Sequence, residues 1–162
     1  MNKHQVGLLG EEMVKCDLIK RGITVYEPIN DKAGHDLLAF TDDHFYRIQI
    51  KASEHKSLNS NGSQGLSYRI STKMIHWSPN FVEGKRKVNV LFYDRCQTDI
   101  MAFVLIDDNI VCYSNVEWVK EKRSVHISID KESTKTSYTK LVDFPPKEKQ
   151  LNHPHQQFSY SI

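Results

Sequence analysis

The clearest hydrophobic pattern in the chain lies at residues 31–53, which read DKAGHDLLAFTDDHFYRIQIKAS. An apolar run at residues 37–40 is followed by polar residues 41–44 and then by an alternating aromatic and β-branched run at residues 45–52. Two such runs joined by a short polar segment are typical of a β-hairpin. The pattern therefore predicts an antiparallel hairpin whose turn lies at residues 41–44.

The second strand of this hairpin separates two sets of side chains. Because successive side chains point to opposite faces of a strand, one face carries Arg47, Gln49 and Lys51, and the other carries Tyr46, Ile48 and Ile50. Asp36 precedes the first strand, so antiparallel pairing brings its carboxylate toward Gln49 and Lys51. A carboxylate, an amide oxygen and a lysine held together predict a divalent-metal phosphodiesterase centre. The alternative is a turn acid beside the polar face of a half-exposed strand.

A helix is predicted before the hairpin. Residues 5–21 carry apolar side chains at helical spacing, and Gly22 stands where a helix typically stops. The positions expected to face the core are Leu8, Leu9, Met13, Cys16 and either Leu18 or Ile19. A first strand is predicted at residues 23–26. Gly34 is expected to adopt a positive φ or to let the backbone approach Asp36 closely.

Further strands are predicted after the hairpin, at residues 67–72, 88–93, 99–106, 110–113 and 124–129. The almost wholly apolar character of residues 88–93 favours a central position in the sheet. A helical turn is predicted at residues 73–77, and a helix capped by Ser114 and Asn115. The polar residues 54–66 and 81–87 are predicted to be surface loops.

Composition places these elements in one domain. The chain has 162 residues with a net charge of +2, which is only mildly basic. Its three cysteines are scattered without a CxxC motif, so we expect reduced thiols and a cytoplasmic protein. No apolar run is long enough to span a membrane. We predict an α/β domain with a mixed central sheet at residues 1–144, followed by a polar tail at 145–162.

These motifs together resemble the PD-(D/E)XK nuclease superfamily. The resemblance rests on Asp36 and Gln49-Ile50-Lys51, preceded by Gly10-Glu11 in the predicted helix. By motif it covers roughly residues 5–53. His35 stands where a proline is usual, and Gln49 stands where a second acid is usual. A Gln-x-Lys motif is similar to that of the bacterial homing endonuclease encoded in a group I intron. No P-loop, G-x-S-x-G or H-E-x-x-H motif competes with it.

The resemblance implies a restriction-endonuclease-like core and a Mg²⁺ site. It implies that Asp36 is the principal metal ligand, with Gln49, the Ile50 carbonyl and Glu11 contributing. Lys51 would hold or polarise the attacking water. The resemblance selects Glu11 rather than Glu12, although an acid early in a helix is more often solvated or placed to stabilise the helix dipole.

The function expected from the resemblance is Mg²⁺-dependent, site-specific cleavage of double-stranded DNA by a homing-type endonuclease. One active site cuts one strand, so a homo-oligomer is expected, and the resemblance implies a dimer of dimers. A Holliday-junction resolvase or a restriction-type nuclease of the same superfamily is the alternative enzyme. A catalytically inactive DNA-binding module is the alternative outside enzymes, because Gln49 replaces an acid.

Candidate DNA-contacting side chains follow the hairpin. The residues with groups that contact phosphates or base edges are Lys56, Asn59, Gln64, Arg69, Lys73, Lys85, Arg86 and Lys87. Lys85, Arg86 and Lys87 form the densest basic run. The segment at residues 54–66 is equally compatible with a solvated connector, and a short charge run such as residues 85–87 is usually a solvated loop.

Overall fold

The structure is a computed structural model of the whole chain. It describes residues 1–29, 34–54, 56–58, 66–82, 85–93, 95–128 and 144–146, with the backbone alone for 56–58, 66, 74–82 and 85–90. The remaining residues, including all but Pro145 and Pro146 of the predicted tail, lie outside this description.

A five-stranded sheet forms the centre of the molecule. Its strands lie in the order β1 (Thr24–Tyr26), β2 (Leu37–Thr41), β3 (His44–Ser53), β8 (Ile100–Leu105) and β9 (Ile110–Asn115). Strands β3 and β8 pair in parallel, whereas the other neighbours are antiparallel. The mixed sheet predicted from the sequence is therefore confirmed.

Strands β2 and β3 form the predicted hairpin. Thr41 pairs with His44, and the two turn residues Asp42 and Asp43 have φ of 50° and 57°. Two consecutive positive φ values are those of a type I′ turn, whose twist matches that of the flanking strands. Aspartate tolerates this left-handed region better than most residues. The polar run at residues 41–44 therefore closes the hairpin and fixes its register.

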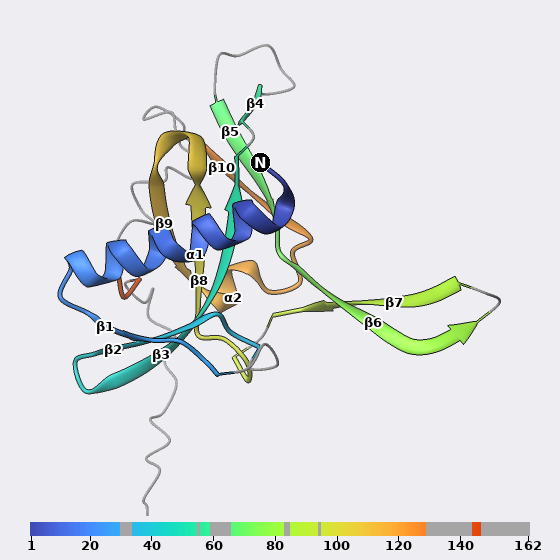
Figure 1. Ribbon diagram of the computed structural model, residues 1–162, viewed down its shortest axis with the longest axis horizontal. Coiled ribbons are helices and arrows are strands. Elements are labelled where there is room, and N and C mark those ends of the chain that lie inside the picture. The colour runs from blue at the N-terminus through green and yellow to red at the C-terminus, as the bar shows by residue number, and fades with distance from the viewer. Residues whose placement is uncertain are drawn as a thin grey trace, which may run out of the picture.

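Helix α1 (Lys3–Lys20) crosses one face of this sheet (Figure 1). It begins with a capping box, in which Asn2 Oδ1 accepts from the Gln5 N–H and Gln5 Oε1 accepts from the Asn2 N–H. It is followed by Gly22 at a φ of 76°. The helix is confirmed where the sequence predicts it.

Most of the α1 residues that the sequence predicts to face the core are not buried. The helix buries Val6, Gly10, Val14 and Leu18, which recur every four residues. Leu8 and Leu9 are exposed, and so is Cys16. The apolar pattern misleads because the buried row contains a glycine, whose missing side chain lets the helix approach the sheet closely.

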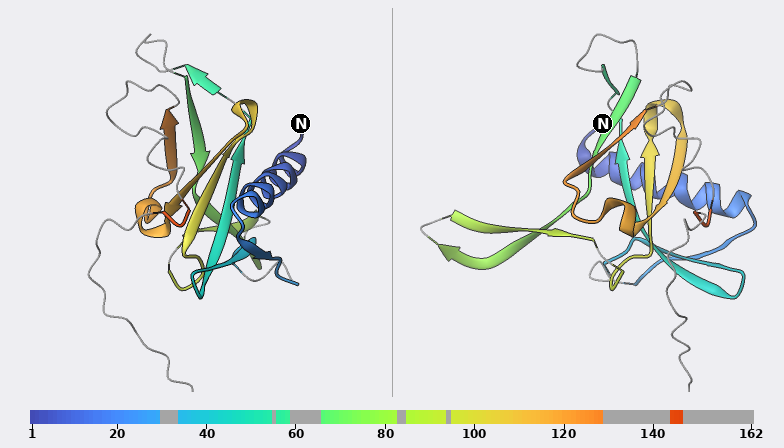
Figure 2. Two further views of the ribbon diagram at one scale, coloured as in Figure 1. Left: turned by 90° about the vertical axis from the view of Figure 1, so that its left-hand side faces the viewer. Right: turned by 180° about the vertical axis from the view of Figure 1, so that it is seen from behind.

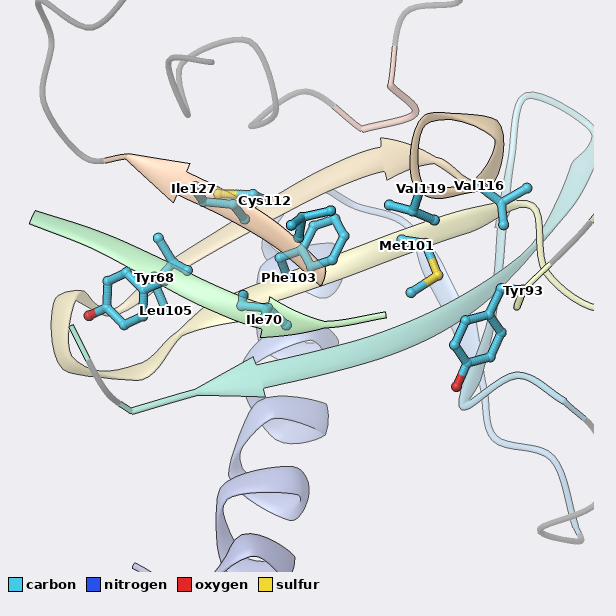
Figure 3. Packing of buried hydrophobic residues seen from close by; sticks show 11 residues of the cluster. Tyr68, Ile70, Tyr93, Met101, Phe103, Leu105, Cys112, Val116, Val119 and Ile127 are labelled. Carbon is cyan, nitrogen blue, oxygen red and sulfur yellow. The ribbon is translucent and has the colours of Figure 1, made fainter. Parts of the chain in front are cut away.

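A second, smaller sheet covers the opposite face of the central sheet. It contains β10 (Ser124–Ser128), β5 (Leu66–Ser71) and β4 (Lys56–Leu58), so part of the predicted loop at residues 54–66 is a strand. Figure 3 shows Tyr68 and Ile70 of β5 and Ile127 of β10 facing side chains of β8. The short helix α2 (Val116–Val119) closes this core and is capped by Asn115, as expected.

Strand β8 is the centre of the fold, because all six of its residues are buried. Met101, Phe103 and Leu105 belong to the core shared with the smaller sheet. Ile100, Ala102 and Val104 belong to the core beneath α1. The molecule therefore has three layers, which the side view in Figure 2 shows as helix, central sheet and small sheet.

Strands β6 (Lys73–Val82) and β7 (Lys85–Phe92) form a separate two-stranded sheet. Three predictions fail here. Residues 73–77 are a strand rather than a helical turn, residues 81–82 and 85–87 continue the hairpin rather than form a loop, and residues 88–93 are not central. The run of apolar residues resembles a buried strand, but cross-strand pairing in the hairpin satisfies its backbone instead.

Short connections complete the described chain. A 3₁₀ turn η1 (Ile106–Asp108) and Asn109 at a φ of 53° join β8 to β9, where the sequence predicts a hairpin turn. Cys16, Cys96 and Cys112 form no disulfide in the structure. Among the described residues, none of the helices has the length and apolar character that crossing a bilayer requires.

Candidate active site

The predicted catalytic side chains gather around one cavity. Glu11, Asp36, Gln49 and Lys51 line a space of about 860 Å³ between the first half of α1 and the second half of β3. Ile50, whose carbonyl is a predicted ligand, lines the same space. The structure therefore brings together residues from a helix and a hairpin that the sequence singles out, and their catalytic role remains a prediction.

Asp36 is held against β3 by main-chain and side-chain contacts. Leu37 pairs with Ile48 across the hairpin, and the Asp36 N–H donates to the Ile48 carbonyl at 2.8 Å. The Oδ2 atom of Asp36 accepts from the Ile50 N–H at 2.7 Å and also from the Gln49 side-chain amide. One carboxylate oxygen is thereby fixed by two consecutive residues of β3.

Gln49 is a buried polar residue, with 8% of its surface exposed. A half-exposed polar strand face, the alternative to a site, requires a solvated residue here. Its Nε2 faces the Asp36 carboxylate, which only accepts hydrogen bonds, and lies 3.5 Å from the Ile50 carbonyl oxygen. The amide thus spans the carboxylate and the main-chain carbonyl that are the proposed metal ligands.

Glu11 reaches this cavity because of Gly10. A Cβ atom placed on Gly10 would lie 2.6 Å from the Cβ of Ala52, a distance that real atoms do not adopt. Only glycine therefore lets α1 pack this closely on β3 beside Lys51. The Gly10-Glu11 pair has a physical reason: the glycine sets the distance and the next residue supplies the carboxylate.

The two acids of the site carry shifted pKa values. Burial raises the pKa of Asp36, and the Ile50 N–H and the charge of Lys51 offset this only in part. Burial, and then the negative charge of Asp36, raises the pKa of Glu11. A bound cation would favour the ionised form of both groups. Without a cation, the surroundings of this cavity therefore disfavour the ionised form of both carboxyls.

Lys51 and Tyr93 are neighbours in this site. The Lys51 Nζ lies 5.1 Å from the centroid of the Tyr93 ring, and the ring is buried. Tyr93 directly follows β7. Sequence reasoning did not single it out, because its only local signal is its place at the end of an apolar run.

Arg47 shares the predicted strand face with Gln49 and Lys51 but has a different partner. Its guanidinium binds Asp99 through Nε at 3.0 Å and Nη2 at 2.9 Å, and it donates to the Cys96 and Arg95 carbonyls. Asp99 also accepts from the Arg47 N–H at 2.8 Å. This contact joins the start of β3 to the chain entering β8, so Arg47 supports the sheet that carries the site.

Two further features bear on the site. Glu54 also lines the cavity and lies 3.2 Å from the N-terminal ammonium, although the sequence analysis did not select it. A second cavity of about 480 Å³ lies beside Tyr46 and Asp99 and contains none of the predicted site residues. The chemistry therefore points to the first cavity.

The candidate DNA-contacting residues are distributed over four regions. Arg69 is exposed on β5, and Lys73 begins β6 half-buried. Lys56 begins β4, and Lys85, Arg86 and Lys87 begin β7, where only the backbone is described. Asn59 and Gln64 lie outside the described residues. Their contacts with DNA remain predictions.

The oxygen atoms of the predicted ligands suit a divalent cation, although the set contains one acid fewer than usual. Within the described part of the chain, no three His, Cys, Asp or Glu side chains converge as a metal site. Carboxylate, amide and carbonyl oxygens are hard ligands of the type that Mg²⁺ binds, so these residues fit the ion.

Comparisons with known protein families and solved structures found matches to this chain. A family model described as PD-(D/E)XK endonuclease matches residues 1–145. Among solved structures, that of a bacterial homing endonuclease, I-Ssp6803I, is similar with a TM-score of 0.64 and 14% sequence identity. The match covers 87% of this chain and 88% of that chain. No curated protein sequence matches significantly.

The structural similarity confirms the restriction-endonuclease-like fold expected from the sequence. The family match extends over both the helix with Gly10 and Glu11 and the hairpin with Asp36 and Lys51. This chain is therefore a member of the PD-(D/E)XK endonuclease family.

Proposed function

We propose that this endonuclease is a Mg²⁺-dependent enzyme that cuts both strands of duplex DNA at a specific site, as homing endonucleases do. The observation that carries the proposal is the convergence of Asp36, Gln49 and Lys51 with Glu11 in one cavity. These residues supply the oxygen ligands and the ammonium that phosphodiester hydrolysis needs.

Asp36, Glu11, Gln49 and the Ile50 carbonyl would hold the ion. Bound Mg²⁺ supplies Lewis acidity and lowers the pKa of water. The chain's own part is positioning: the Ile50 N–H and the Gln49 amide hold the Asp36 carboxylate in place. Lys51, within the same cavity, orients the attacking water and stabilises the negative charge that grows on the phosphate.

The homing-type assignment is supported by the structural similarity to I-Ssp6803I. A homing enzyme cuts one long sequence, whereas a junction resolvase selects the branched shape of its substrate. Cleavage of linear duplexes with random sequence, compared with four-way junctions, distinguishes these activities. Cutting confined to junctions would favour a resolvase and contradict this proposal.

We further propose that the enzyme works as a homo-oligomer, a dimer of dimers. One active site of this kind cuts one strand, so two copies are needed for a duplex. The outer face of α1 supports a contact between copies, since it exposes Leu8, Leu9 and Ile19 opposite its buried row. Light scattering of the purified protein gives the mass that tests this.

The decisive experiment is nicking of a supercoiled plasmid library that carries randomised inserts, with and without Mg²⁺. The wild-type protein is expected to cut with Mg²⁺ and not with a chelator. Lys51→Ala and Asp36→Asn are expected to lose cutting and to keep duplex binding. Lys120→Ala is the matched control, because Lys120 is exposed on the far side of β8 from α1 and pairs with Glu117 at 3.8 Å. A wild-type protein that binds duplexes without cutting them would instead be an inactive binding module.

A further inference from the structure

The β6–β7 hairpin is an arm attached to the candidate active site at both of its ends. It extends away from the three layers in Figure 1 and in the right view of Figure 2. Ser71, which lines the cavity, is two residues before β6, and Tyr93, which lies under Lys51, directly follows β7. The arm therefore starts and ends where the scissile phosphate is proposed to bind.

The base of the arm is fixed to the body. Thr72 is buried between β5 and β6, its hydroxyl donates to the Lys122 carbonyl at 2.5 Å, and its N–H donates to the Arg123 carbonyl at 3.2 Å. On the other strand, Tyr93 is part of the core that the small sheet covers. With both strands held, the direction of the arm relative to the site is set by the fold.

The register of the arm sorts its residues into two faces. His76 pairs with Asn89, and Val82 pairs with Lys85. Because residues in a cross-strand pair share a face and alternate residues return to it, one face holds Met74, His76, Val82, Lys85, Lys87, Asn89 and Leu91. Leu91 is exposed, so solvent reaches this face near the base. The opposite face holds mainly apolar positions, among them Ile75, Trp77, Val88 and Val90, together with the basic positions Lys73 and Arg86.

The length of the arm and the polar residues on the face with His76 and Asn89 suit duplex DNA. The major groove admits a two-stranded β-ribbon, and two-stranded ribbons are strongly twisted, as a path along a groove requires. Ten residues of β6 span roughly 33 Å, which is about ten base-pair steps. Asparagine and lysine are residues that recognise base edges there, and lysine also meets phosphates.

We propose that the β6–β7 hairpin lies in the major groove beside the cleavage site and reads the target sequence, with the paired positions His76 and Asn89 contacting base edges. Lys85 and Lys87, further along the same face, contact bases or phosphates more distant from the cut. This inference rests on the proposed nuclease function and adds the element that gives it sequence specificity.

The test is selection of cleaved molecules from a library of long duplexes with randomised sequence. Wild-type protein, Asn89→Ala, and the opposite-face control Val88→Thr are each sequenced at their cut products. Asn89→Ala is expected to lose base preference by roughly fivefold to 150-fold at one or two adjacent positions, the discrimination that one base contact provides. Val88→Thr is expected to keep the wild-type profile.

A variant that gains a new base preference distinguishes recognition of bases by the arm from misfolding of the arm. Asparagine favours adenine and arginine favours guanine in the major groove. Asn89→Arg is therefore expected to move the preference at the affected position toward guanine, a change that loss of folding cannot produce. Lys85→Ala is expected to act farther from the cut than Asn89→Ala does.

Failure of the proposed function and failure of the hairpin inference give different results. If the wild-type protein neither binds nor cuts any duplex, the proposed function fails and this inference fails with it. If the wild-type protein cuts selectively while Asn89→Ala, Asn89→Arg and His76→Ala keep its profile unchanged, the hairpin inference alone is overturned. A change in oligomeric mass in those variants, with the profile unchanged, would assign the arm to a contact between copies instead.

Discussion

The ammonium nitrogen of Lys51 lies 5.1 Å from the centroid of the Tyr93 ring, and that ring is 5% exposed. A buried aromatic ring beneath a cation holds it by a cation–π interaction. Tyr93 thus positions the lysine proposed to orient the attacking water, and it does so from the end of the β6–β7 arm.

We expect Tyr93→Leu to slow plasmid nicking by roughly twofold to thirtyfold, since a cation–π interaction contributes about 0.5–2 kcal/mol. Tyr93→Phe keeps the ring and is expected to retain most of the rate. Thermal unfolding of both variants reports any loss of packing. Equal rates for Leu and Phe, at equal stability, would remove Tyr93 from the positioning of Lys51.

A second prediction concerns the buried amide. Gln49→Glu places a second carboxylate where the amide now donates to Asp36, so the protein without metal is expected to unfold at a lower temperature. Mg²⁺ should then raise that temperature more than it does in the wild type. Gln49→Leu is expected to lower the cleavage rate by roughly tenfold to a hundredfold, as loss of a ligand or its orienting partner typically does.

The measurements are unfolding temperature and cleavage rate, each against Mg²⁺ concentration. Identical curves for the wild type, Gln49→Glu and Gln49→Leu would show that Gln49 takes no part in the metal site.

A third prediction follows from the contact between α1 and β3. Gly10→Ala adds a methyl group 2.6 Å from the Ala52 Cβ, so we expect about 1–3 kcal/mol lower stability and weaker cutting as Glu11 is displaced. Gly7→Ala is the matched control. It lies one turn earlier in the helix with nothing within 4 Å, and alanine there is expected to stabilise by about 0.5–1 kcal/mol.

Denaturant unfolding measures both variants. The double variant Gly10→Ala with Ala52→Gly removes the opposing methyl and is expected to recover stability. If Gly10→Ala behaves like Gly7→Ala, the close approach is not what the glycine provides.

The fourth prediction is a pH dependence. Burial raises the pKa of Asp99, but the hydrogen bonds and charge of Arg47 outweigh it and leave the pKa below its usual value. A carboxyl whose pKa is lower when folded stabilises the fold above the ordinary carboxyl range, and that contribution disappears as pH falls through the folded pKa. Asp99→Asn is expected to cost about 1–3 kcal/mol at neutral pH.

The difference in stability between the wild type and Asp99→Asn should become smaller as the solution becomes acidic. Chemical unfolding at a series of pH values measures it. A difference that stays constant down to strongly acidic pH would mean that the ionised carboxylate is not what Arg47 recognises.

The site is more predictable from the sequence than the surroundings that hold it. Asp36, Gln49 and Lys51 lie on one local hairpin, whose alternation and turn residues set its register without help from the rest of the chain. Glu11 needed the resemblance to the family, because an acid in a helix has no local mark of function. Arg47 and Asp99 meet only through the parallel pairing of distant strands, and no local pattern reports that.

The failures in the fold have a similar cause. The buried row of α1 is set by close contact at Gly10, which a search for large apolar residues overlooks. Residues 88–93 are apolar enough for a central strand, yet they lie in a two-stranded arm, while β8 takes the centre. Local composition describes how apolar a strand is, but it does not say which neighbour covers it.

The parallel pairing of β3 with β8 has a consequence for synthesis of the chain. Every predicted catalytic side chain precedes Ala52, but Gln49 and Lys51 pair with Met101 and Phe103. Until the ribosome has released β8, the strand that carries Gln49 and Lys51 has an unpaired edge, which is a template for association with other chains. In a nascent nuclease of this kind, the strand that carries Gln49 and Lys51 can pair with β8 only after the whole β6–β7 arm has been made.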